Sequence, residues 1–172
     1  GFSKADALAV MQALEKQGID LIELSGGSYE TPVMMGQSSK EGFFLELLKE
    51  IRDQIHAPLA ITGGFRSHAV MESVIKEKTT DMIGLARPLV IVPDIPKQIA
   101  AGTFDTIKLP RVSFGISALN KKLGPILGLS AYEVAMEHMA KDKPVKVFRN
   151  GWRLLFHLLA SQGVKALVRK RT

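Results

Sequence analysis

The sequence contains no cysteine among its 172 residues. The chain therefore forms no disulfide, and it offers neither a thiolate metal ligand nor a cysteine nucleophile. Long apolar runs are also missing, because no stretch approaches the roughly 20 residues that a membrane-spanning helix needs. Since 46% of the residues are hydrophobic, we expect a protein with a real core. The lack of cysteine is compatible with a reducing cytosol, and we expect a cytoplasmic location and no metal site.

Acidic residues are scarce in the last part of the chain. Residues 141–172 hold nine Lys or Arg and one acid, Asp142, which leaves the other 140 residues with a net charge of −2. The overall charge of +6 therefore belongs to the tail alone. The tail lacks the interleaved aromatic residues and the motifs of nucleic-acid surfaces, so we expect no nucleic-acid partner.

Helical and strand-like segments alternate through about residue 87. A first helix is predicted to begin at Ser3, where Asp6 completes a capping box. The apolar spacing predicts further helices over 40–55 and 67–78, and strands over 20–24, 58–62 and 81–85. Such alternation is typical of βα units around a parallel sheet, either a barrel or a doubly wound sheet.

Beyond Pro93 the pattern changes. We predict a short helix over 95–101 and an irregular connector over 103–125, which contains Gly124 and Pro125. A helix is predicted from Ser130 to Lys141, capped by Ser130, and a last one over 152–168.

Each predicted strand ends in small or basic residues. These ends are Ser25-Gly26-Gly27, Gly63-Gly64 and Ala86-Arg87. Parallel βα units bind ligands at the carboxyl ends of their strands. Glycine lets the backbone approach an anion, a helix start adds partial positive charge, and an arginine can hold a phosphate with two hydrogen bonds. Taken singly, each signal is better explained as a turn or a surface ion pair, but the last two together favour a phosphate site.

Three stretches also carry a resemblance to a known family. They are GIDLIELSGG (18–27), PLAITGGFR (58–66) and DMIGLARPL (81–89), followed by VPDIP (92–96). In order and spacing they resemble the last three strand regions of the old yellow enzyme family of NAD(P)H:flavin oxidoreductases. The resemblance implies an α/β fold, a TIM (β/α)8 barrel of which residues 1–102 form about the last three βα units. Residues 103–172 are then an irregular connector and a basic helical tail.

The family implies an FMN at the mouth of the barrel, reduced by NADH or NADPH and reoxidised by a small-molecule electron acceptor such as an activated alkene. By position, Gly63 and Gly64 would face the FMN phosphate with their amides. Ala86 and Arg87 would stand where the family usually has a Gly-Arg pair. Because alanine restricts φ, phosphate binding at this point requires Ala86 to have a negative φ.

The same resemblance places Ser25 and Gly26 near the cofactor and Tyr29 on the substrate side. The family's paired substrate-binding His/His or His/Asn positions, and its Tyr proton donor, belong to strands that would precede Gly1. We assign no catalytic residue here, and we interpret the four histidines as surface or packing residues. Three parallel strands cannot close an eight-stranded barrel, so we expect a fragment of a larger polypeptide, inactive without the missing N-terminal strands.

Two other functions remain open. One is a non-catalytic phosphate-ligand or assembly module built on a partial barrel, and the other is a phosphate-binding TIM-barrel isomerase or aldolase. The latter lacks a candidate Schiff-base lysine at a strand end. The tail from Trp152 to Arg171 is interpreted as a helix packed on the barrel or on a neighbouring subunit of a homo-oligomer, with a weak, peripheral contact to an anionic membrane surface as the alternative.

Overall fold

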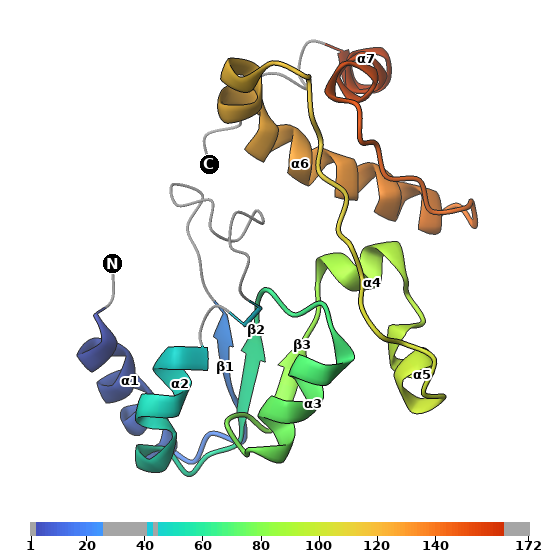
Figure 1. Cartoon of the computed structure of the whole chain (residues 1–172). Coiled ribbons are helices and arrows are strands. Elements are labelled where there is room, and N and C mark those ends of the chain that lie inside the picture. The colour runs from blue at the N-terminus through green and yellow to red at the C-terminus, as the bar shows by residue number, and fades with distance from the viewer. Residues whose placement is uncertain (1–2, 26–40, 43–44, 164–172) are drawn as a thin grey trace. The chain divides into compact units, whose positions relative to one another are not determined.

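The computed structural model describes residues 3–25, 41–42 and 45–163. The chain divides into two compact units, one made of Gly1–Leu89 and Asp94–Ile107 and the other of Val90–Pro93 and Lys108–Thr172. In chain order the elements are α1 (Lys4–Lys16), β1 (Ile22–Ser25), α2 (Leu45–Ile51), η2 (Arg52–Gln54), β2 (Leu59–Thr62), α3 (His68–Lys76), β3 (Met82–Gly84), α4 (Arg87–Ile91), α5 (Ile95–Ala100), α6 (Ser117–Met139) and α7 (Gly151–Gln162) (Figure 1).

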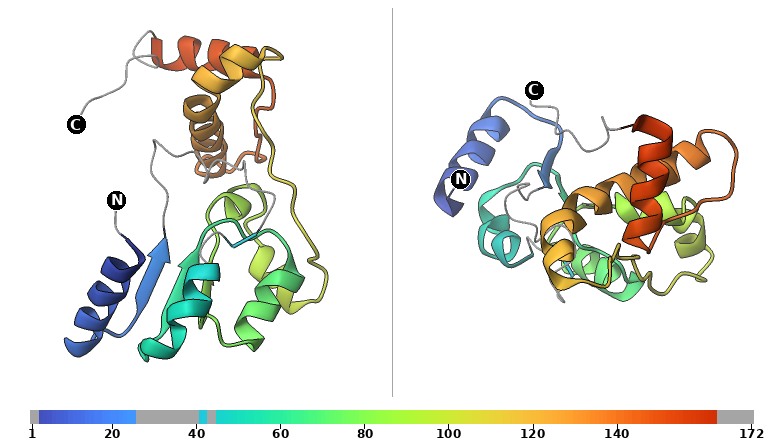
Figure 2. Two further views of the ribbon diagram at one scale, coloured as in Figure 1. Left: turned by 60° about the vertical axis from the view of Figure 1, so that its left-hand side comes forward. Right: turned by 90° about the horizontal axis from the view of Figure 1, so that it is seen from above.

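The first unit is built on a parallel sheet with the strand order β1-β2-β3. Leu59 and Ile61 of β2 are fully buried on one face, and Ala60 and Thr62 alternate with them on the other. The connecting helices α2 and α3 lie on the same side of the sheet, as right-handed crossovers require (Figures 1 and 2). The predicted α/β class with parallel strands is confirmed.

Helix α1 begins as the sequence predicted. The Ser3 backbone N–H donates to Asp6 Oδ2 at 3.0 Å, and the Asp6 N–H donates to Ser3 Oγ at 3.2 Å. This reciprocal capping box satisfies two of the backbone donors that a helix start leaves without partners. The helix predicted over 40–55 is shorter than expected, since it consists of α2 followed by the 3-10 turn η2.

The second unit corrects two predictions. Helix α6 runs from Ser117 to Met139, so residues 117–125 are not irregular and Ser130 lies inside the helix instead of capping it. The prediction treated Gly124 and Pro125 as helix breakers, and this was wrong. The buried residues Leu127, Ala131 and Val134 of α6 pack with Phe114 and with Leu154 and Leu158 of α7. Their burial outweighs the propensity cost of one glycine and one proline.

Helix α7 is fixed to the segment before α6 by close packing. Its N-cap is Asn150, whose side chain accepts the Arg153 N–H at 3.1 Å. The Trp152 indole N–H donates to Phe114 O at 3.2 Å, and the two rings meet edge to face at 5.2 Å. A side chain on Gly151 would come within 2.9 Å of the Phe114 ring, so this position requires glycine. The predicted continuation of the helix to Val168 lies outside the described residues.

Among residues 3–25, 41–42 and 45–163, no helix combines the length and the apolar character needed to cross a membrane. A spanning helix needs roughly 20 mostly apolar residues. Helix α6 is long enough at 23 residues, but charged and polar side chains interrupt its apolar positions.

Candidate functional site

The carboxyl ends of the three strands lie side by side. Ser25 pairs in register with Thr62, and Thr62 pairs with Gly84. We call the predicted site residues that follow or end these strands the carboxyl-end site: Ser25, Gly63, Gly64, Ala86 and Arg87. The other two predicted residues, Gly26 and Tyr29, lie outside the described part of the chain.

Gly63 and Gly64 form the turn that leads out of β2. Their φ angles are +138° and +81°, which side chains of L-amino acids rarely tolerate. Two consecutive positions of this kind explain why glycine stands at both. Both residues are half-buried and carry no side chain, so a ligand can approach their backbone closely.

Ala86 and Arg87 lie at the end of β3. Within the described residues, the non-glycine positions with positive φ are Lys78 and Asp142. Ala86 is not among them, so it has the negative φ that phosphate binding at this position requires. Arg87 begins α4, a short helix that the sequence did not predict, and Pro88 is its second residue. Proline suits a first helical turn because an N–H there has no partner within the helix.

Thr62 links the ends of all three strands. Its hydroxyl donates to Glu23 Oε1 of β1 at 2.7 Å, and a Cβ at Gly84 of β3 would overlap its side chain. Gly84 is therefore required for the close approach of β2 and β3. Sequence reasoning missed this role of Thr62, although the polar residues Glu23 and Thr62 alternate with apolar neighbours as a two-sided strand predicts.

Glu41 holds the loop between β2 and α3. Its Oε2 accepts the backbone N–H groups of Arg66 and Ser67 and the hydroxyl of Ser67, each at 3.0 Å. From another segment, the Ile107 N–H donates to Arg66 O at 2.9 Å, and the side chain of the preceding residue, Phe65, is buried. The loop is thus tied to two distant segments. No local sequence signal marks Glu41 for this role.

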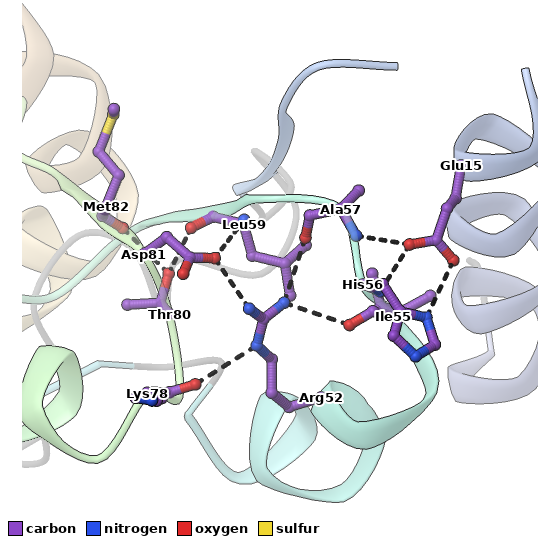
Figure 3. Close-up of polar contacts among 10 residues, drawn as sticks. All are labelled: Glu15, Arg52, Ile55, His56, Ala57, Leu59, Lys78, Thr80, Asp81 and Met82. Atoms are coloured by element: carbon purple, nitrogen blue, oxygen red, sulfur yellow. Dashed lines mark hydrogen bonds and ion pairs between the residues drawn. The ribbon is translucent and has the colours of Figure 1, made fainter. Parts of the chain in front are cut away.

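The opposite end of the sheet is held by Arg52 (Figure 3). Its guanidinium donates to three backbone carbonyls, those of Ile55, Ala57 and Lys78, at 3.2–3.3 Å. It also donates to Asp81 Oδ2 at 3.0 Å. A planar group with five N–H donors suits such a position, because it can serve several acceptors at once.

Asp81 and Thr80 extend this arrangement to the first residue of β2. Asp81 Oδ2 accepts the Leu59 N–H at 2.8 Å, and Leu59 O accepts the Asp81 N–H at 2.9 Å. The buried Thr80 hydroxyl lies 2.8 Å from Leu59 O and 3.0 Å from Met82 O (Figure 3). We refer to Arg52, Thr80 and Asp81, with Glu15, as the amino-end clamp.

Glu15 contributes the contact between α1 and β2. One of its oxygens accepts the backbone N–H groups of His56 and Ala57, and the other lies 3.7 Å from His56 Nδ1 (Figure 3). Desolvation raises the pKa of Glu15, but the backbone hydrogen bonds from Ala57 and His56 and the charge of His56 together leave it below its usual value. The carboxylate is therefore stabilised in its ionised form.

The histidines occupy scattered positions. His56 is exposed beside Glu15, His68 starts α3, His138 Nδ1 lies 3.2 Å from Pro144 O, and the His157 ring packs on Phe148 at 5.2 Å. In the described part of the chain, no group of three His, Cys, Asp or Glu side chains is arranged to hold a metal. The histidines therefore form no candidate site, and the carboxyl-end site is the one that the strand ends bring together.

Comparison with known proteins gives several sequence relatives, among them NADH-dependent flavin oxidoreductases. Over 93 residues the chain is 44% identical to NADH-dependent flavin oxidoreductase iccE of Talaromyces variabilis, covering 48% of this chain and 22% of that protein. Over 131 residues it is 34% identical to NADH-dependent flavin oxidoreductase iliE of Neonectria sp., covering 68% of this chain and 17% of that protein. The chain thus spans about a fifth of the length of these curated relatives, and the predicted resemblance is confirmed.

A solved structure of 2-naphthoyl-CoA reductase in complex with 2-naphthoyl-CoA is similar in fold. The TM-score is 0.53 at 23% identity, and the match covers 59% of this chain and 16% of that chain. At this level of identity the likeness concerns the fold alone. No family model matches the chain.

Proposed function

This chain is related to the NADH-dependent flavin oxidoreductases, and on that premise we propose that it forms the FMN phosphate-binding part of a larger enzyme of the old yellow enzyme type. The three parallel strands would be the last three of a (β/α)8 barrel. The parent protein would take NADH or NADPH as reductant and a small electron-poor acceptor such as an activated alkene. The short span relative to the relatives supports the interpretation as a fragment.

One observation carries the proposal. Two consecutive glycines with positive φ leave β2 directly beside the strand that leads into Ala86 and Arg87. Backbone amides without shielding side chains, together with an arginine, are the donor set that binds phosphate oxygens. Ala86 fits the place of the family's glycine because it does not adopt a positive φ. The residues present therefore suit the phosphate of FMN.

The roles of the residues follow from this arrangement. FMN, when bound, would supply the hydride-transfer chemistry, and the protein would bind and orient it. Gly63, Gly64, Ala86 and Arg87 would hold the phosphate. Ser25 and Gly26 would lie along the cofactor, with the substrate toward Tyr29. None of these residues is assigned a proton-transfer step.

The proposal is tested first on the natural protein as purified. We expect an intact mass above the 18.8 kDa of this chain and the visible spectrum of bound flavin, released as FMN on denaturation. A protein of 18.8 kDa that takes up no FMN on titration would contradict the proposal. A flavin-free protein of higher mass that also fails to bind FMN would contradict it equally.

Arg87→Ala tests the phosphate site itself. A charge-assisted bidentate contact contributes strongly to the free energy of binding, so its loss should raise the Kd for FMN about tenfold or more. Flavin fluorescence titration measures this Kd. The Kd for riboflavin, which has no phosphate, should not change. Arg153→Ala, at an exposed position of α7, serves as the matched control. An unaltered Kd for FMN in Arg87→Ala would remove Arg87 from this role.

A further inference from the structure

Glu41 is bound to the start of α3 by a single oxygen. The three donors to Oε2 are two consecutive backbone amides and a hydroxyl, those of Arg66 and Ser67, all at 3.0 Å. The carboxylate is half-buried and lies 25 residues before Arg66 in the chain. Such a long-range contact fixes two loops relative to each other, rather than completing a local turn.

This contact decides which donors a ligand can use. A helix start favours an anion, and at α3 a carboxylate of the protein already occupies the amides of Arg66 and Ser67. An external anion at this loop would therefore use other backbone groups, and the turn at Gly63 and Gly64 supplies such groups. A flexible glycine pair gains precise placement only if the residues that follow it are held.

The residues that follow are held on two sides. Glu41 fixes the N–H of Arg66, and Ile107 N–H fixes its carbonyl at 2.9 Å. Phe65, next to Gly64, is buried, and a Cβ at Gly42, beside Glu41, would come within 3.3 Å of its ring. The backbone that Glu41 holds is therefore joined to the second glycine through a single residue, the buried Phe65.

We propose that Glu41 is a positioning residue for the cofactor phosphate, which acts by holding the Gly63-Gly64 turn in its ligand-binding shape. This inference rests on the proposed function. Glu41 itself takes no part in phosphate contact, since its negative charge faces the helix start. Its effect is transmitted through the backbone from Ser67 to Gly64.

Glu15 provides a matched control for this role. It also accepts two consecutive backbone N–H groups from residues far away in the sequence, His56 and Ala57. Those groups precede β2, whereas the partners of Glu41 follow it. Removing either carboxylate leaves two backbone donors without their partner, but only Glu41 is joined to the glycine turn.

The test uses the natural protein with Glu41→Ala, Glu41→Gln and Glu15→Ala, and measures the Kd for FMN and for riboflavin. Glu41→Ala should raise the Kd for FMN about tenfold and leave that for riboflavin within about twofold, because the phosphate alone depends on the turn. Glu41→Gln keeps an acceptor oxygen, so it should restore the native Kd for FMN to within about threefold. Glu15→Ala should leave both Kd values unchanged.

Several outcomes would overturn the inference. They are an unchanged Kd for FMN in Glu41→Ala, an equal loss of FMN and riboflavin binding, or an equal effect of Glu15→Ala. Should Glu41→Ala not fold, Glu41→Asp, whose shorter side chain misplaces the acceptor, is judged by the same criteria. The Kd values of the wild-type protein separate this failure from failure of the proposed function. A wild-type protein that binds no FMN, or binds it no better than riboflavin, contradicts the proposed function as a whole.

Discussion

At the amino end of β2 and β3, long charged side chains hold the backbone, whereas at the carboxyl end the strands run into glycines. Arg52 alone reaches three carbonyls and Asp81 at the first end. At the second end, Gly63 and Gly64 have positive φ angles, and Gly84 lets the Thr62 side chain pack directly against the backbone of β3. The same small sheet thus has one end in which long side chains bind backbone groups and one in which glycines stand in the place of such side chains.

The difference separates stability from ligand binding. In parallel βα proteins the carboxyl ends of strands carry function and the opposite ends carry stability. The contacts of Arg52, Asp81 and Thr80 serve stability, since the partners named above for these residues lie within the first unit. Loss of a side chain at the amino end should therefore lower the free energy of unfolding, whereas loss of Arg87 at the carboxyl end should weaken FMN binding. Gly84 is an exception at the carboxyl end, because a side chain there would disturb the packing of the sheet itself.

Gly84→Ala is expected to have the largest effect on stability. The new methyl group would overlap the Thr62 side chain, and overpacking of this kind lowers the free energy of unfolding by about 2–3 kcal/mol. Urea denaturation of the natural protein measures the loss. In a Thr62→Ala background the penalty should shrink, because the overlapping hydroxyl is gone. Strict additivity of the two substitutions would contradict the steric explanation.

Arg52→Ala should have the next largest effect and lower the free energy of unfolding by about 2 kcal/mol. Three carbonyls and Asp81 lose their hydrogen-bond donor, and water replaces only part of these hydrogen bonds. Hydrogen exchange should accelerate at the Leu59 and Asp81 amides. The Kd for FMN should stay at its native value, in contrast to Arg87→Ala. Arg52→Lys keeps the charge but not the fork of donors, so it should recover only part of the stability. A large rise in the Kd for FMN would show that the two ends are coupled.

The smallest effect is expected at Glu15 and depends on pH. Desolvation opposes ionisation of Glu15, but its backbone hydrogen bonds leave the folded-state pKa below the unfolded one. Its contribution to stability is thus complete above the unfolded pKa and disappears as pH falls through the folded pKa. The difference in unfolding free energy between the native protein and Glu15→Gln should therefore shrink from neutral to acidic pH. A constant difference across that range would exclude a role for the charge.

Much of the first unit could be predicted from its sequence. The three strands end within a residue or two of their predicted limits, because apolar runs followed by small residues mark both the strand and its end. The full length of helix α6 could not be predicted, since Gly124 and Pro125 are strong local signals for the end of a helix. The packing that outweighs them involves Leu154 and Leu158 of another helix. Local patterns do not contain such tertiary contacts.

The candidate site divides in the same way. The glycine turn and the Ala86-Arg87 end are contiguous in sequence, so a pattern could identify them and a family resemblance could give them roles. Glu41 could not be found in this manner, because its partners lie 25 and 26 residues away and a lone glutamate in a loop carries no signal. The assignment of the phosphate contacts stays a prediction until FMN binding is measured.

The double attachment of the loop after β2 also has a consequence for folding. Its hydrogen bond from Ile107 joins segments far apart in sequence, and contacts of large sequence separation form late because the loop-closure entropy must first be overcome. During synthesis the loop cannot be complete before residue 107 has left the ribosome. The turn at Gly63 and Gly64 should therefore acquire its native shape after the strands have paired, so a nascent chain would not hold the cofactor until its first unit is finished.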